Sequence, residues 1–247
     1  MAGHSKWANI KHRKGAQDAK RGKIFTKLIK EITVAVKESG PDETTNPRLR
    51  LAIGNAKGNN MPKDTIERAI KKASGADAAN YFDVTFEGYA PNGVAVFVEC
   101  MTDNNNRTVS NVRSVFTKNG GSLGTNGSLE FIFERKGVFQ IPMKENMDED
   151  ELTLELIDAG AEEVEVQDDL MIVTCAMNDF GSLQKKLEEI GIEPENAELQ
   201  RIPNTMVELD DDSFKKVMKM IDTLEDDDDV QKVFHNLETS EEQMQLL

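Results

Sequence analysis

The apolar positions at the start of the chain recur at the spacing of amphipathic helices. This spacing predicts helices over 16–39, 46–58 and 62–75. Asn46 is a good N-cap residue for the second helix, and Pro47 suits its first turn. The pattern therefore predicts a bundle of three short helices at the beginning of the chain.

Beyond residue 78 the pattern changes to strands alternating with helices. It predicts, in chain order, strands over 84–86 and 94–101, a helix over 108–118, strands over 129–133 and 138–141, a helix over 149–158, strands over 163–166 and 171–175, a helix over 180–190, a strand over 197–201, a helix over 212–224 and a strand over 230–234. The βαββαβ order between 136 and 203 is that of a ferredoxin-like unit.

We therefore predict an α+β protein of three domains, a helical N-terminal bundle plus two ferredoxin-like α/β units, one inserted in the other. The expected domains are a basic helical domain with a flexible N-terminal arm over 1–78, a discontinuous α/β domain over 79–135 and 204–247, and an inserted α/β domain over 136–203. A serial arrangement with a small C-terminal appendage is the alternative. The tail from Thr239 is expected to be frayed.

Charge is distributed very unevenly along this pattern. The whole chain has a formal charge of −15, yet Met1–Gly75 holds 17 Lys and Arg against 7 Asp and Glu. Self-repulsion alone would spread like charges apart, so a basic front on an acidic body indicates a surface for a polyanion such as nucleic acid.

Nine of the basic residues of this region lie within the first 30 positions, on the arm and on the first helix. At helical spacing the lysines of the first helix fall opposite its apolar face, and Arg107 and Arg113 could extend the surface. The predicted nucleic-acid contacts are Lys6, Trp7, Lys11, His12, Arg13, Lys14, Lys20, Arg21, Lys23, Lys27, Lys30, Arg107 and Arg113. Trp7 could stack on an unpaired base or anchor the arm. Phosphate contacts of this kind weaken steeply with salt, whereas a merely solvated helix face would bind nothing.

Other chemistries find little support in the sequence. Cys100 and Cys175 lie in apolar runs without metal-ligand spacing, which favours buried structural thiols in a reducing cytoplasm. No window approaches the roughly 20 apolar residues of a membrane span. The glycine-rich stretch 119–128 is typical of a tight connection, and Asp226–Asp229 of a solvated turn. We predict no catalytic residue, no metal site and no cofactor.

Four segments resemble the YebC/PmpR family. They read GHSKWANIKHRKGAQDAKRGKIFTKL, NPRLRLAIGNAKGNNMPKDTIERAIKKASG, FEGYAPNGVAVFVECMTDNNNRT and VRSVFTKNGGSLGTNGS. The resemblance implies a three-domain cytoplasmic protein with a helical N-terminal domain. Family members are described as DNA-binding transcriptional regulators or as ribosome-associated factors that help translation through proline-rich stretches, and a mitochondrial relative activates translation of a cytochrome oxidase subunit. Ala90 and Asn105 depart from the glycine and arginine usual in the family, which leaves Arg107 as the candidate phosphate contact there.

The sequence thus predicts a non-enzymatic, nucleic-acid-binding regulator of gene expression in the cytoplasm. DNA and ribosomal RNA both remain open as targets, with the ribosome as a further partner, because phosphate contacts do not specify a sequence. No helix carries a convincing set of base-reading side chains, which favours structured RNA or weakly specific DNA. The alternatives are a ligand-binding or protein-interaction module built on the ferredoxin-like domains, and a hydrolase without a recognisable motif.

Overall fold

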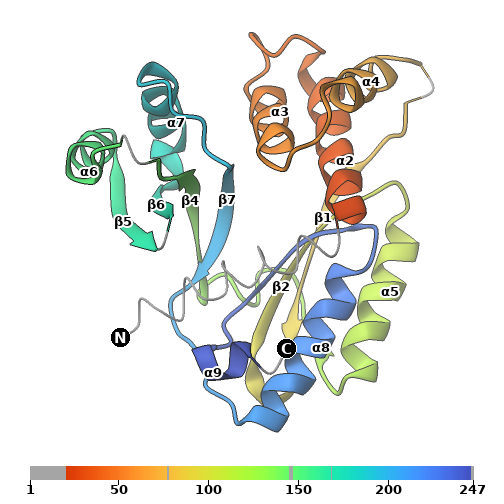
Figure 1. Ribbon diagram of the computed structural model, residues 1–247. Helices are drawn as coiled ribbons and strands as arrows, with labels where there is room; N and C mark the ends of the chain where they lie inside the picture. The colour runs from red at the N-terminus through yellow and green to blue at the C-terminus, as the bar shows by residue number, and fades with distance from the viewer. Residues whose placement is uncertain (1–20, 77, 145–146, 168, 246–247) are drawn as a thin grey trace. The chain divides into compact units, whose positions relative to one another are not determined.

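The computed structural model describes residues 21–76, 78–144, 147–167 and 169–245 and shows a mixed α+β protein (Figure 1). The chain forms two compact units. The first combines the chain up to Lys30 with 79–134 and the segment from Ile202 onward, and the second combines 31–78 with 135–201. The predicted α+β class is confirmed, while the predicted boundaries of three domains stay a prediction.

The three predicted N-terminal helices are present, the first from Arg21 onward because 16–20 lie outside the described residues, and one asparagine links the first two. They are α2 (Arg21–Ser39), α3 (Pro47–Gly58) and α4 (Lys63–Ala73). Asn46 caps α3 by accepting a hydrogen bond from the Leu49 N–H at 3.0 Å. Its amide nitrogen donates to the carbonyl oxygens of Ala35 at 2.7 Å and Gly40 at 2.8 Å. One buried side chain therefore ties the start of α3 to the end of α2.

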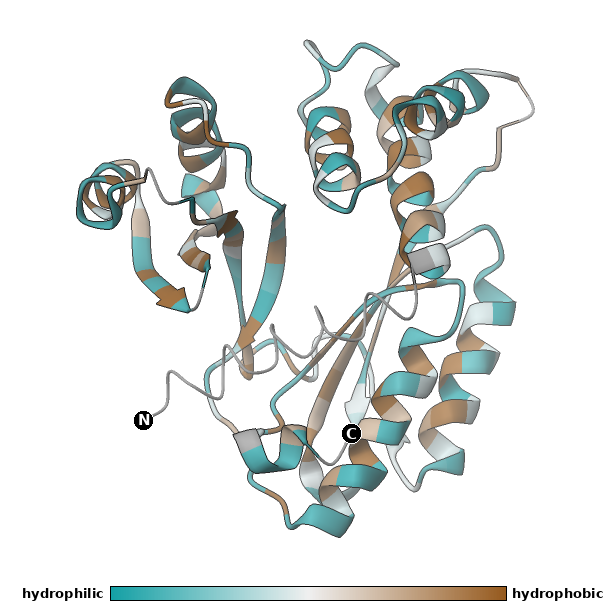
Figure 2. Cartoon of the chain, in the orientation of Figure 1, coloured by the Kyte–Doolittle hydropathy of each residue, from teal (hydrophilic) through white to brown (hydrophobic). Residues whose placement is uncertain are grey.

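The first unit contains a four-stranded sheet in the order β3-β1-β2-β8. Its strands are β1 (Phe82–Tyr89), β2 (Ala95–Thr102), β3 (Ser122–Leu123) and β8 (Val230–His235), and its helices are α5 (Asn105–Lys118) and α8 (Asp211–Glu225). Phe116 of α5 and Phe214 of α8 are fully buried against the sheet. Figure 2 shows hydrophobic and hydrophilic positions side by side on both helices, as a helix that covers a sheet requires. β8 thus completes this sheet beside β2, and α8 packs against it.

The second unit contains the other four-stranded sheet, in the order β5-β6-β4-β7. Its elements along the chain are β4 (Phe133–Pro142), α6 (Glu149–Asp158), β5 (Ala161–Gln167), β6 (Leu170–Ala176), α7 (Phe180–Glu189) and β7 (Asn196–Pro203). The first and third strands lie in the centre, which is the strand order of a ferredoxin-like unit. Phe139, Leu156 and Leu183 join its core.

The strand predicted over 129–133 is wrong. Residues 129–132 form turns, and Phe133 begins β4. Leu129 is fully buried whereas Phe131 is 74% exposed, so the two do not share one face as they would in a strand. The buried carboxylate of Glu87 accepts hydrogen bonds from the Gly127 and Leu129 N–H groups, both at 2.7 Å, and holds the turn in place.

The tail is also more ordered than expected. Ser240 caps a short helix, α9 (Glu241–Met244), through a capping box with Gln243. The Gln243 side chain donates to the Leu209 carbonyl oxygen at 2.9 Å. The sequence hides this contact because its two partners lie 34 residues apart.

Candidate nucleic-acid interface

The outer lysines of α2 contact the acidic turn between α8 and β8, which we define as residues 225–229. Lys23 Nζ lies 2.9 Å from Asp226 Oδ1 and 3.1 Å from the Asp226 carbonyl oxygen. Lys27 Nζ donates to the Glu225 carbonyl oxygen at 3.1 Å. The Lys23 and Asp226 side chains are 42% and 49% exposed, so water and dissolved ions can reach this ion pair. An exposed pair of this kind exchanges readily with other charged partners.

Lys30, about one helical turn after Lys27 in α2, lies in a different environment. Its side chain is only 9% exposed. Its ammonium group donates to Asp229 Oδ1 at 3.2 Å and to the carbonyl oxygens of Met101 at 3.2 Å and Asp228 at 2.6 Å. The ammonium also lies 5.1 Å from the centre of the Tyr81 ring. These three acceptors match the three N–H donors of a lysine, so Lys30 does not extend the exposed basic stripe of α2, which we define as Lys23 and Lys27.

Asp229 is the carboxylate at the centre of this cluster, and it is buried. Besides Lys30, it accepts hydrogen bonds from Arg107 Nη2 at 2.7 Å, from Arg107 Nε at 3.0 Å and from Thr108 Oγ1 at 2.9 Å. Burial raises the pKa of Asp229, but the hydrogen bonds from Arg107, Thr108 and Lys30 outweigh it and hold the pKa below its ordinary value. Asp226–Asp229 was expected to be a solvated turn, and its last residue is instead a buried anchor for two cations.

Arg107 is accordingly engaged within the protein. Its guanidinium forms a bidentate contact with Asp229 through Nε and Nη2. Its Nη2 atom also lies 2.9 Å from Asp103 Oδ1. Hydrogen bonds to Asp229 and Asp103 raise the pKa of Arg107. The side chain as a whole is 46% exposed, so part of it is open to solvent. Among the predicted contacts, Arg107 thus combines a structural role with partial access.

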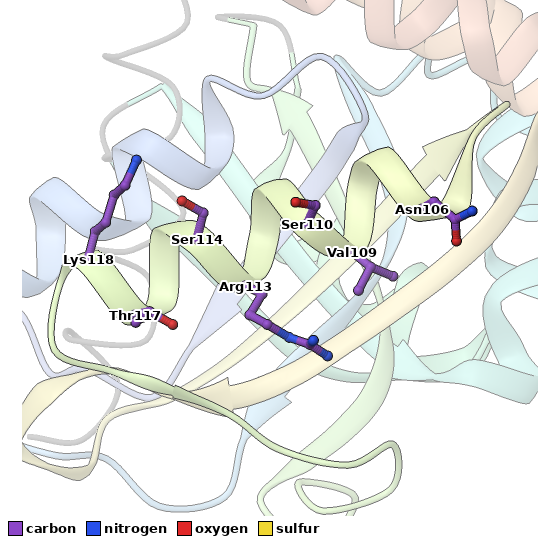
Figure 3. A pocket seen from close by; sticks show the side chains of 7 residues that line it. All are labelled: Asn106, Val109, Ser110, Arg113, Ser114, Thr117 and Lys118. Atoms are coloured by element: carbon purple, nitrogen blue, oxygen red, sulfur yellow. The ribbon is translucent and has the colours of Figure 1, made fainter.

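The outer face of α5 offers a second exposed basic surface. Figure 3 shows the side chains that line a shallow hollow there, namely Asn106, Val109, Ser110, Arg113, Ser114, Thr117 and Lys118. Arg113 and Lys118 are exposed, and neither forms an ion pair with any carboxylate in the described part of the chain. Hydroxyl groups and unpaired cations on one face are donors that suit phosphate oxygens.

The remaining predicted contacts belong to the arm and to the beginning of the first helix. Lys6, Trp7, Lys11, His12, Arg13, Lys14 and Lys20 lie outside the described residues. Arg21 begins α2. Sequence reasoning missed the role of Asp229 and the exposed Lys118. The run of four aspartates was a visible signal, but nothing near it in sequence indicated its cationic partners.

The two cysteines are buried and are not paired with each other in a disulfide. Burial raises the pKa of the Cys100 thiol to about 12 and that of the Cys175 thiol to about 11. Both groups therefore remain protonated near neutral pH and are poor nucleophiles. This agrees with the interpretation of both residues as buried structural thiols.

Among residues 21–76, 78–144, 147–167 and 169–245, no group of three or more His, Cys, Asp or Glu side chains is arranged to hold a metal ion. Likewise, within those same ranges, the helices are all too short or too polar to cross a membrane.

The fold is that of a multi-domain α+β protein. Its basic helix α2 forms ion pairs with the acidic turn through Lys23 and Lys30. The family model for the TACO1/YebC N-terminal domain matches residues 5–76, and the model for the TACO1/YebC second and third domain matches residues 81–237. The chain therefore belongs to the TACO1/YebC family, as the sequence resemblance indicated.

Similar proteins match along nearly the whole chain. A protein of Amoebophilus asiaticus is 58% identical over 98% of this chain and 100% of its own length, and one of Syntrophotalea carbinolica is 57% identical over 99% and 98%. Both carry the name "Probable transcriptional regulatory protein". The crystal structure of a conserved hypothetical protein from Aquifex aeolicus is similar with a TM-score of 0.80 and 45% identity, covering 91% of this chain and 93% of that one.

Proposed function

We propose that this protein is a non-enzymatic, cytoplasmic regulator of gene expression that binds nucleic acid through exposed cations. The observation that carries the proposal is the segregation of charge. Met1–Gly75 holds 17 basic and 7 acidic residues, and the remainder of the chain holds 13 basic and 38 acidic ones. A polyanion is attracted to the first region and repelled by the second. The name carried by the relatives supports a role in regulation.

The proposed contacts are the predicted residues of the arm together with Arg21, the outer lysines of α2 and the exposed cations of α5. Lys23 and Lys27 have partners that a phosphate can replace, and Arg113 is exposed on the hollow of α5. Lys30 and Arg107 bind Asp229 and so hold the acidic turn beside Lys23 and Lys27. Since these groups meet phosphates and not base edges, binding should depend strongly on salt and weakly on sequence.

Duplex DNA is the first ligand to test, because the relatives are named as transcriptional regulators. The second candidate is ribosomal RNA, with the protein acting on the ribosome as a translation factor that relieves stalling at proline-rich stretches. The absence of an evident base-reading helix from the sequence favours this second candidate.

A charge-reversal pair tests the proposal. The Lys11→Glu/Lys14→Glu variant changes the arm, and the Lys144→Glu/Lys185→Glu variant makes the same change in charge on exposed residues of the second unit. Binding of each full-length protein to a random-sequence duplex and to ribosomal RNA is measured by fluorescence anisotropy, and ribosome association by co-sedimentation. We expect the arm variant to bind at least tenfold more weakly than the control variant. Equal affinities would overturn the proposal.

The same experiment distinguishes duplex DNA from ribosomal RNA as the preferred ligand. Retention on ribosomes at a salt concentration that strips duplex DNA supports the translation role. Tighter binding to DNA than to ribosomal RNA at every salt concentration supports the transcription role.

A further inference from the structure

The acidic turn offers the α2 lysines the same kind of acceptors that a phosphate backbone would offer. Lys23 meets the Asp226 carboxylate, Lys27 meets the Glu225 carbonyl oxygen, and Lys30 meets Asp228 and Asp229. Lys23, Lys27 and Lys30 therefore each already have an oxygen partner in one short segment. A nucleic acid that binds the stripe must compete with this segment.

The contacts differ in how easily they can be exchanged. At the inner end, Lys30 and Asp229 are buried, and Arg107 and Thr108 hold the same carboxylate. At the outer end, Lys23 and Asp226 are about half exposed. Breaking a buried pair leaves a charge without a partner, whereas an exposed pair opens with little loss. Competition is therefore confined to Lys23 and Lys27, and the inner contacts keep the turn in place beside them.

We propose that the acidic turn is a built-in competitor for nucleic acid and that Asp226 is a specificity-determining residue. A single phosphate that replaces Asp226 at Lys23 gains little binding free energy, because one anion is exchanged for another. A chain of closely spaced phosphates can replace the partners of Lys23 and Lys27 at the same time. The stripe thus favours extended nucleic acid over single nucleotides. The inference rests on the proposed function and adds a basis for selectivity to it.

The proposal has a consequence for salt dependence. When a free lysine binds a phosphate, the counterion of that phosphate is released. When Lys23 leaves Asp226 to do so, the freed carboxylate takes up a cation, and the net release is smaller. Removing the charge of Asp226 should therefore steepen the dependence of log K on log salt by up to about 0.9 for duplex DNA.

The experiment compares two substitutions that remove one negative charge from α8 or its end. Asp226→Asn removes the partner of Lys23, and Asp212→Asn changes an exposed residue in the first turn of α8. Both full-length proteins and the wild type are titrated with a random-sequence duplex and with ADP between about 50 and 200 mM salt, the range over which phosphate contacts lose most of their affinity. We expect Asp226→Asn to bind the duplex three- to tenfold more tightly than Asp212→Asn at the low-salt end, with a steeper slope. We also expect ADP to bind Asp226→Asn more tightly than the wild type.

A third variant tests the pairing itself, and the outcomes separate the two proposals. In Lys23→Gln/Asp226→Asn the gain in duplex affinity should disappear, because Lys23, the partner of Asp226, is also removed. Equal duplex affinities and slopes for Asp226→Asn and Asp212→Asn would overturn the competitor while leaving nucleic-acid binding intact. Failure of the wild type and of every variant to bind the duplex or ribosomal RNA would overturn the proposed function, and the competitor with it.

Discussion

Asp229→Asn is the substitution that tests the buried cluster most severely. The change keeps the size of the side chain and removes its charge. Lys30, 9% exposed, and Arg107 would then face a neutral amide, and the new NH₂ group would replace an oxygen that now accepts from Arg107, Thr108 or Lys30. The two cations would also lose the anion that separates them.

The magnitude follows from the number of charged contacts that are broken. Removing one partner of a buried ion pair destabilises a protein by about 3–5 kcal/mol, because the remaining charge stays buried without compensation. Arg107 is partly exposed and can be solvated, which lowers the cost, whereas Lys30 cannot. We therefore expect the free energy of unfolding of the first unit to fall by about 3 kcal/mol.

The assay is urea unfolding followed by circular dichroism, repeated across pH. The pKa of Asp229 lies below its unfolded value in the folded protein, so its stabilisation is complete above about pH 4 and is lost as pH falls through the folded pKa. The difference between wild type and variant should be full at pH 7 and should shrink below about pH 4. A loss below about 1 kcal/mol at pH 7 would place the cluster among weak surface pairs and refute the reasoning.

Buried polar side chains and buried thiols elsewhere in the molecule can be tested in the same way. Asn46→Ala should lower the free energy of unfolding by about 2–3 kcal/mol in urea titrations, since it removes a helix cap and leaves two carbonyl oxygens without their donor. Glu87→Gln should cost about 1–3 kcal/mol in the same assay, since its new NH₂ group cannot accept from the backbone N–H groups of the turn. Cys100 and Cys175 should react with a thiol reagent at the rate of unfolding near pH 7, and prompt labelling of the native protein would contradict their burial and raised pKa values.

Local signals predicted most of the elements. The helix predicted over 149–158 coincides with α6, where Asp148 caps the helix and acidic side chains fill its first turn. The start of α3 was equally clear from Asn46 and Pro47. In these cases the residues that determine the element lie within it or directly beside it.

Distant partners explain what the sequence did not reveal. The turns that replace the predicted strand are held by Glu87, about 40 positions earlier, which accepts hydrogen bonds from the Gly127 and Leu129 N–H groups. The lysines of α2 do share one helix face, as their spacing predicted. Their different burial arises from the acidic turn, 199 positions away from Lys30 in the case of Asp229. Periodicity gives the face on which a side chain lies but not what covers that face.

The salt dependence of binding to a random-sequence duplex tests the central claim most directly. Each neutralised phosphate contributes a slope of about −0.9 to log K against log salt, so contacts from the arm, α2 and α5 together should give a slope of about −3 or steeper. The slope should flatten in the Lys11→Glu/Lys14→Glu variant and remain in the Lys144→Glu/Lys185→Glu control. A slope near zero, or no binding to this duplex or to ribosomal RNA at the lowest salt, would contradict the account.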